Sequence, residues 1–189
     1  YGSGDKMTYA YAVNSSNQGL LMYTDGGHGF EVGDKFTGAA DKSIKKDNGA
    51  PRVNGIKANK MSVTNDNPVV ATEVTSFSTI TAANHSAFVT LKNAQANVSG
   101  DVVTLSDGTT SLTFFDKFGT GLTASNFINT ARYNVTGIIM LNGTTIQIAP
   151  RTTAGVEWIH GTLDDPKNPT VVEVGTTKAS LTWDAVDNI

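Results

Sequence analysis

Short runs of apolar and polar residues alternate along most of the chain, and turn-forming residues separate them. The clearest example is residues 132–150, in which two β-rich runs are joined by Asn142-Gly143. Asn-Gly accepts positive φ at both central positions of a type I′ turn, which matches the twist of a two-residue β-hairpin. We therefore predict a hairpin here, with Ile138 and Ile146 facing the core. Its apolar residues are Val135, Ile138, Ile139, Met140, Ile146 and Ile148.

Similar runs predict β-strands through the rest of the chain, and few segments predict helix. Residues 65–83 are rich in Thr, Ser and Asn and indicate a linker with one short strand, whereas residues 123–129 favour a short helix. Further strands are expected over residues 8–13, 20–24, 35–46, 52–56, 61–63, 87–91, 102–105 and 111–115. This pattern is typical of an all-β protein.

The pattern of the first half recurs in the second half. Each half contains a strand, a returning strand, a Gly-containing loop or short helix, and then a second hairpin. This order is the signature of the five-stranded Greek-key barrel known as the OB-fold. The anchors of the alignment are residues 21–25 with 112–116, Gly27 and Gly29 with Gly119 and Gly121, and Asn48-Gly49 with Asn142-Gly143.

We predict an all-β fold of two consecutive five-stranded OB-like Greek-key barrels, the first lacking its first strand. The first module comprises residues 1–75 and the second residues 76–160, and residues 161–189 form a linker and a strand of a following module. The first strand of the first module is expected upstream of Tyr1. Without it the sheet has an open edge, which proteins usually cover.

The composition limits the possible functions. Of the 189 residues, 39% are hydrophobic and 16% are charged, and the net charge of −3 provides no overall field that would hold polyanions or an anionic membrane. Cysteine is absent, so disulfides and thiol catalysis are excluded. No run of about 18 apolar residues occurs, and we expect no membrane insertion in this segment.

Longer strings in both halves resemble the tandem OB-like modules of large exported or cell-surface proteins of Bacteroidetes. The similarity is carried by GLLMYT and GFEVGDKFTG in the first half, and by FVTLKNAQ, LSDGTTSLTFFDKFG and YNVTGIIMLNGTTIQIAP in the second. It covers residues 8–159 and implies a non-catalytic, exported module beside further domains, with the leader outside this sequence. Residues 178–186 (KASLTWDAV) resemble the opening strand of a fibronectin type III-like or immunoglobulin-like domain.

The chain contains no catalytic signature, because the G-x-S-x-G, H-E-x-x-H and P-loop motifs are absent. Its histidines, His28, His85 and His160, lack metal-ligand spacing and are expected to be solvated or packed. Asp25 and Asp116 lie beside Gly-containing loops, where a carboxylate suits either a cation such as calcium or an ordinary turn. We therefore expect a protein that is not an enzyme and uses no cofactor or metal.

Candidate binding residues gather in the first module. Residues 35–60 hold seven basic residues against two acidic ones, and aromatic side chains lie on the preceding strands. OB-folds bind oligonucleotides and oligosaccharides on the face of their second and third strands. The predicted ligand-binding set is Tyr9, Tyr11, Tyr23, Lys42, Lys45, Lys46 and Arg52.

Three interpretations of this set remain open. The first is adhesion or carbohydrate binding, directed at glycans or other surface proteins, which the many Asn, Thr, Ser and Gly residues suit. The second is single-stranded nucleic-acid binding, in which lysines track the phosphates and aromatic rings stack on bases. The third is a structural spacer with no small ligand, in which the lysines protect a strand edge and the tyrosines are half-buried strand residues.

Overall fold

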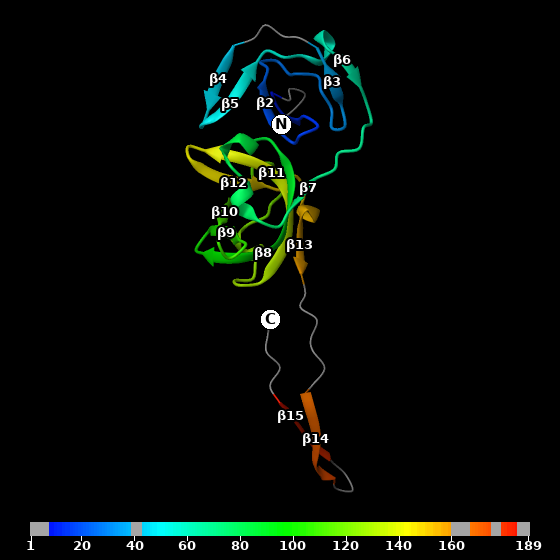
Figure 1. Ribbon diagram of the computed structural model, residues 1–189, viewed down its shortest axis with the longest axis vertical. Helices are drawn as coiled ribbons and strands as arrows, with labels where there is room; N and C mark the ends of the chain where they lie inside the picture. The colour runs from blue at the N-terminus through cyan, green and yellow to red at the C-terminus, as the bar shows by residue number, and fades with distance from the viewer. Residues whose placement is uncertain (1–7, 39–42, 160–166, 175–178, 185–189) are drawn as a thin grey trace. The chain divides into compact units, whose positions relative to one another are not determined.

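The computed structural model describes residues 8–38, 43–159, 167–174 and 179–184, and it confirms the predicted all-β fold (Figure 1). Every helix in these ranges is a single 3₁₀ turn, so the helix predicted over 123–129 is reduced to three residues. The turns are η1 (Ala58–Lys60), η2 (Phe77–Thr79), η3 (Ala82–Asn84), η4 (Ala124–Asn126) and η5 (Thr153–Gly155).

The second half of the chain forms a closed five-stranded barrel. Its strands pair in the order β8-β9-β10-β12-β11, and β11 returns to pair with β8. Strands β10 and β12 are parallel, and the other neighbours are antiparallel. This closed arrangement is that of an OB-like barrel. The strands are β8 (Phe88–Ser99), β9 (Val102–Ser106), β10 (Ser111–Phe114), β11 (Arg132–Asn142) and β12 (Thr145–Ala149).

The barrel contains the main hydrophobic core of the chain. Alternate residues of the strands point inward, so that Leu91, Val135 and Ile139 are fully buried. Phe77 of η2 joins this core, and its backbone N–H donates to Asp107 Oδ2 at 2.6 Å. Since burying a large apolar side chain stabilises a fold by about 1.5–3 kcal/mol, this core is the main source of stability in the barrel.

The hairpin predicted at residues 132–150 is present as β11 and β12, but its turn is displaced by one residue. Asn142 pairs with Thr145, so Gly143 and Thr144 are the central residues, and of these two only Gly143 has positive φ (64°). This is the arrangement of a type II′ turn, and the predicted type I′ turn is wrong. The register places Ile139 opposite Ile148 in the core, and burial of this pair outweighs the local turn preference.

The same register corrects the inward face of β11. Ile146 packs at the edge of the core, as predicted. Ile138 is buried, but it neighbours Phe88 and Ala149 on the face opposite to that of Ile139. Successive residues of a strand point to opposite faces, so the prediction that Ile138 faces the barrel interior is wrong.

The first half forms a four-stranded sheet in the order β1-β2-β5-β4. Strands β2 and β5 are parallel and the other neighbours are antiparallel, which repeats the directions and chain order of β9-β10-β12-β11. In the described part of this half, no strand corresponds to β8, in agreement with a barrel that lacks its first strand. The strands are β1 (Tyr9–Val13), β2 (Gly19–Tyr23), β4 (Ile44–Asp47) and β5 (Ala50–Asn54).

A smaller core lies on one face of this sheet. Met22, Phe30 and Ile56 are buried there, and half-buried apolar residues surround them. Asn48 and Gly49 connect β4 to β5 with φ of 46° and 92°, as a type I′ turn requires. The polar strand predicted over 35–46 is instead two strands, β3 (Lys35–Thr37) and β4, and β3 pairs with β6 (Ser62–Thr64).

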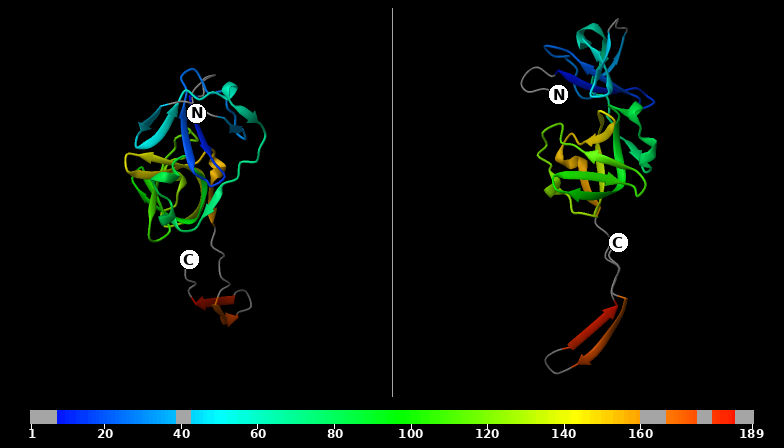
Figure 2. Two further views of the ribbon diagram at one scale, coloured as in Figure 1. Left: turned by 45° about the horizontal axis from the view of Figure 1, so that its top comes forward. Right: turned by 90° about the vertical axis from the view of Figure 1, so that its left-hand side faces the viewer.

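Two short strands extend the barrel sheet, and one hairpin forms a two-stranded sheet of its own (Figure 2). Strand β7 (Thr72–Val74) pairs with β8, and β13 (Val156–Ile159) adjoins β11; β14 (Lys167–Val174) and β15 (Ala179–Asp184) pair only with each other. The chain divides into two compact units, residues 1–158 and 159–189. The predicted boundary between the two modules, near residue 75, falls inside the first unit and stays a prediction.

Candidate functional site

One face of the four-stranded sheet carries most of the predicted ligand-binding residues. Tyr9 pairs with Tyr23 across β1 and β2, and Arg52 is the partner of Lys45 across β5 and β4. Residues paired directly across neighbouring strands point to the same side of a sheet. Leu21 of β2 is the partner of both Tyr11 of β1 and Arg52 of β5. These pairs place residues of all four strands on the same face of the sheet. We name this surface the tyrosine face; it consists of Tyr9, Tyr11, Tyr23, Lys45 and Arg52.

Tyr9, Tyr23 and Arg52 form a compact cluster on the tyrosine face. The ring centroids of Tyr9 and Tyr23 are 5.0 Å apart, and Arg52 Cζ lies 4.8 Å from the Tyr23 centroid, within cation–π range. Arg52 Nη1 donates to Asp47 Oδ2 at 2.8 Å, and Arg52 Nε donates to Asn54 Oδ1 at 3.0 Å. Four strands therefore hold the guanidinium in one orientation.

Asp47 offsets the charge of this cluster. The Tyr9 hydroxyl donates to Asp47 Oδ2 at 3.0 Å, and the same oxygen accepts from Arg52. Burial, followed by the hydrogen bond to Asp47, raises the pKa of Tyr9. The hydroxyl therefore stays protonated at neutral pH, and the cluster presents aromatic rings and polar groups with little net charge.

The predicted lysines do not all contribute to this face. Lys45 is exposed on it, whereas Lys46 is exposed on the opposite face because it is the next residue along β4. Lys42 lies outside the described residues. One cation that the sequence did not indicate is Lys117, whose Nζ lies 5.8 Å from the centroid of the Tyr9 ring.

The barrel supplies further contacts to the tyrosine face. Phe118 meets Tyr11 edge-on, with ring centroids 5.8 Å apart. Leu141 packs in one apolar cluster with Leu21 and Ala50 of the first module. These barrel residues come from the loop after β10 and from the β11–β12 hairpin, so no local sequence pattern could indicate that they meet Tyr9 and Tyr11. The barrel therefore covers part of the tyrosine face.

Glycines allow the four-stranded sheet and the barrel to approach closely. The Gly143 N–H donates to the Asn48 carbonyl at 2.9 Å, so the two hairpin turns meet. A Cβ on Gly49 would lie 2.4 Å from the Gly143 carbonyl oxygen, and a Cβ on Gly19 would lie 1.6 Å from that of His85. A larger residue at either position would push the modules apart.

The described histidines, His28 and His85, are buried. His28 Nδ1 accepts a hydrogen bond from the Phe30 N–H at 3.0 Å, and Nε2 lies 3.1 Å from the Tyr9 carbonyl oxygen, which it reaches as a donor. Burial lowers the pKa of His28 and that of His85. Both are therefore neutral at physiological pH; His160 lies outside the described residues.

Of the two candidate cation ligands, Asp116 holds a turn. Asp116 accepts hydrogen bonds from the Thr120 N–H and hydroxyl and from the Gly121 N–H. Burial opposes its ionisation, but these hydrogen bonds outweigh burial and lower the pKa of Asp116. Asp25 is exposed. Within the described ranges, no three acidic, His or Cys residues gather in a way that would hold a metal ion.

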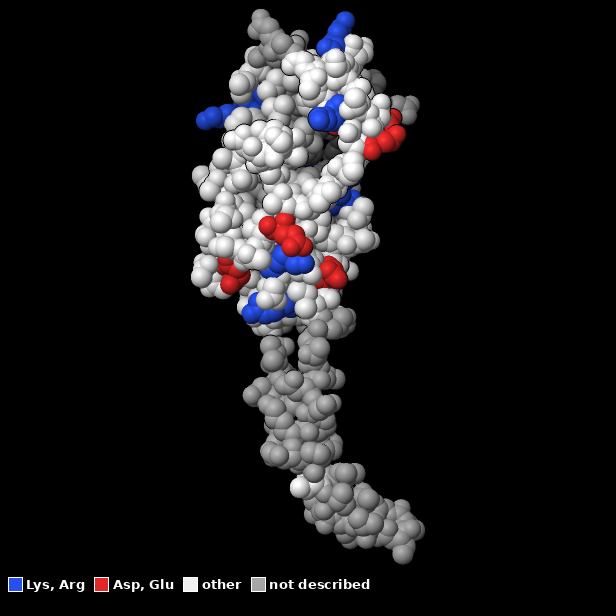
Figure 3. All heavy atoms as spheres, turned by 45° about the vertical axis from the view of Figure 1, so that its right-hand side comes forward, with Lys and Arg blue, Asp and Glu red and all other residues white. Residues whose placement is uncertain are grey.

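Charges of both signs are interspersed on one face of the molecule. On the face shown in Figure 3, Lys and Arg side chains alternate with Asp and Glu among many uncharged residues. A single-stranded nucleic acid favours a groove of one sign that follows its backbone. This face therefore offers no such track among its described residues.

No protein-family profile matches the chain, and no curated protein matches it either. The helices within the described ranges are too short to cross a membrane. The similarity to the OB-like modules of Bacteroidetes proteins stays a prediction, and the function is argued from the site.

Proposed function

We propose that the chain is a non-catalytic module of a bacterial secreted or surface protein, and that the tyrosine face binds a saccharide. The cluster of Tyr9, Tyr23, Arg52 and Asp47 carries this proposal. Sugars present flat C–H surfaces that lie on aromatic rings and hydroxyls that bond to fixed polar groups. The module would then serve adhesion to glycans beside further domains of a longer protein.

The pairing of Arg52 with Asp47 favours a neutral ligand. A phosphate would compete with the Asp47 carboxylate for the guanidinium, whereas a sugar hydroxyl can accept from the Arg52 or donate to the Asp47 without breaking their 2.8 Å contact. The Asn54 amide, which is held by Arg52 Nε, adds another neutral hydrogen-bonding group.

A glycan array followed by calorimetric titration of its hits tests the proposal. We expect binding of a neutral saccharide that Tyr23→Ala abolishes, because this ring supports both Tyr9 and Arg52. Trp158→Ala is the matched control, since Trp158 is an exposed aromatic residue far along the chain on β13. If Tyr23→Ala and Trp158→Ala bind the saccharide equally well, the saccharide does not bind at the tyrosine face.

Single-stranded nucleic-acid binding is a second candidate, favoured by the approach of Lys117 to the Tyr9 ring on the face that Lys45 also occupies. Fluorescence anisotropy of a labelled mixed-sequence oligonucleotide at low and physiological salt tests it. Binding that weakens steeply with salt and is lost in a Lys45→Ser, Lys117→Ser variant would support it, because phosphate contacts release counterions. Failure of both ligand classes would leave the spacer role.

A further inference from the structure

The closed barrel shows what the first module lacks. In the barrel, β8 lies between β9 and β11 and pairs antiparallel with both. The corresponding strands of the first module are β1 and β4, the two outer strands of its sheet. Among the described residues, β4 pairs only with β5. The outer edge of β4 in the first module therefore corresponds to the edge of β11 that pairs with β8 in the barrel.

Equivalent residues of the two modules differ sharply in exposure. Counted from the pair that closes each turn, Ile44 and Val53 correspond to Ile139 and Ile148. Ile139 and Ile148 are fully buried, whereas Ile44 is 72% exposed and Val53 is half-buried. An apolar side chain so exposed at a sheet edge indicates a position that another chain segment covers.

The backbone N–H and C=O groups of β11 form hydrogen bonds on the side that corresponds to the outer edge of β4. The Ile139 N–H donates to the Ala87 carbonyl at 2.9 Å, and the Ser86 N–H donates to the Ile139 carbonyl at 2.7 Å. These donors and acceptors come from the segment that enters β8. Ile44 occupies the equivalent position in β4, so an added strand would meet the same pattern of backbone groups.

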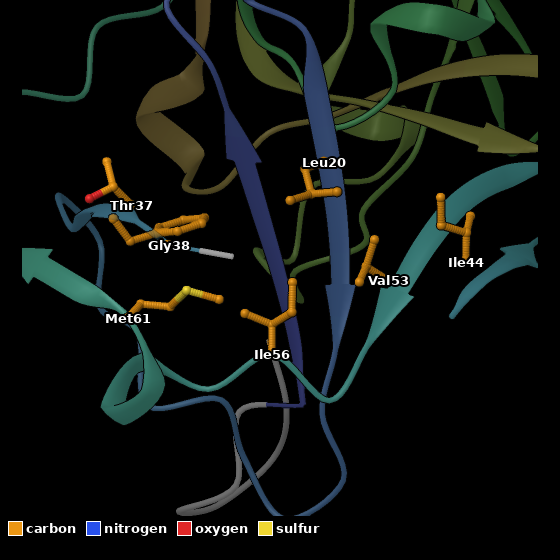
Figure 4. Close-up of a pocket in the computed structure, with 8 residues that line it drawn as sticks. Leu20, Thr37, Gly38, Ile44, Val53, Ile56 and Met61 are labelled. Carbon is orange, nitrogen blue, oxygen red and sulfur yellow. The ribbon is translucent and has the colours of Figure 1, made fainter. Parts of the chain in front are cut away.

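An apolar groove lies beside this edge and opens to solvent. Figure 4 shows Leu20, Val53 and Ile44 on one side and Met61 on the other, with Ile56 between them. Its volume is about 320 Å³, which lies within the range of sites that bind ligands. We name it the strand groove; its apolar lining residues are Leu20, Phe36, Ile44, Val53, Ile56 and Met61.

We propose that the strand groove binds an extended segment of a partner polypeptide, which adds to β4 in antiparallel orientation and closes the first barrel as β8 closes the second. The pattern of β8 sets the chemistry of the partner, since Val89 and Leu91 point inward while Thr90 and Lys92 alternate with them. Two exposed cations, Lys45 and Lys46, lie on β4, so acidic residues on the partner suit this edge. This site is separate from the tyrosine face and does not depend on saccharide binding.

Amide hydrogen exchange of the full chain with a synthetic peptide of residues 86–99 tests this proposal. We expect the amides of Ile44–Asp47 to gain protection of at least about tenfold, while β11 stays unchanged because its edge is already paired. A peptide carrying Thr90→Glu and Lys92→Glu should bind more tightly at low salt, and one carrying Leu91→Pro should not bind.

Ile44→Asp in the protein should abolish this protection without unfolding it, because Ile44 is exposed. Val70→Asp is the matched control, since Val70 is 81% exposed and lies outside the strand groove. Protection that is absent at saturating peptide, or that the Leu91→Pro peptide reproduces, would overturn the proposal. Protection of β4 without peptide would also overturn it, because the occupant would then be a second copy if the protection increases with protein concentration and a segment of the same chain if it does not.

Discussion

Single glycines control how closely the modules approach. Gly49 has φ of 92° and would place a Cβ 2.4 Å from the Gly143 carbonyl oxygen, whereas Gly108 has φ of 96° and open space around it. We expect Gly108→Ala to lose only about 1–2 kcal/mol of unfolding free energy through backbone strain. Gly49→Ala should lose more unfolding free energy than Gly108→Ala, because the new Cβ would clash with the Gly143 carbonyl oxygen in addition to the same backbone strain. Urea unfolding compares the two variants, and equal losses would mean that the hairpin turns do not touch in solution.

His28 makes stability depend on pH. Burial lowers its pKa below 6.5 in the folded chain, so below that pH the unfolded chain binds more protons and the stability falls. Protonation of Nδ1 would also break the hydrogen bond from the Phe30 N–H. We expect Tm to fall as pH decreases from ~7 to ~5, and His28→Asn to weaken this dependence.

His85 acts in the same direction, since its pKa is also lowered by burial. The His28→Asn variant should therefore keep part of the pH dependence, and a His28→Asn, His85→Asn variant should lose more of it. Thermal unfolding followed by circular dichroism measures each curve. A wild-type Tm that stays constant over this pH range would contradict the assignment of neutral, buried histidines.

At the scale of elements, the β11–β12 hairpin stabilises the barrel through its inward residues. Ile148 is fully buried opposite Ile139, so Ile148→Ala should cost about 2–5 kcal/mol of unfolding free energy by leaving a cavity. Ile128→Ala is the control, because Ile128 is 53% exposed and a surface substitution usually changes stability by less than ~0.5 kcal/mol. A similar loss in both variants, measured by urea unfolding, would refute the inward assignment of Ile148.

The sequence predicted strands better than turns or faces. Alternating runs bounded by Gly, Asn and Asp located β1, β2, β9 and β10, because strand formation follows local side-chain pattern. The Asn142-Gly143 turn was wrong by one residue, since its register depends on the distant burial of Ile139 against Ile148. Asn48-Gly49, by contrast, forms a type I′ turn between Asp47 and Ala50.

The candidate site was predictable only in part. Tyr9, Tyr23 and Arg52 do gather, as their positions on strands of one sheet indicate. The sequence did not indicate two further charges at this site. Asp47 forms an ion pair with Arg52, and Lys117 extends from the barrel to the ring of Tyr9. Contacts between the first half of the chain and the barrel join segments that are distant in sequence. The residue pattern within a single segment therefore cannot predict them.

For the whole molecule, the contact at Gly19 joins β2 to the segment that enters β8. A Cβ there would lie 1.6 Å from the His85 carbonyl oxygen and 2.9 Å from Ser86 Cβ. We expect Gly19→Ala to separate the first module from the barrel and to turn one thermal transition into two, the upper one near the wild-type Tm. Differential scanning calorimetry resolves these transitions. A single transition at the wild-type temperature would show that the backbone absorbs the methyl group at no cost.

The ring of the barrel closes between strands that are distant in sequence, with Val135 beside Leu91. During synthesis, β8, β9 and β10 leave the ribosome before β11, and they have no closed core to bury until β11 arrives. Loop-closure entropy opposes their early assembly, and contacts of this kind slow folding. The barrel should therefore emerge as an unfolded chain and fold in one late step, once β11 and β12 have been synthesised.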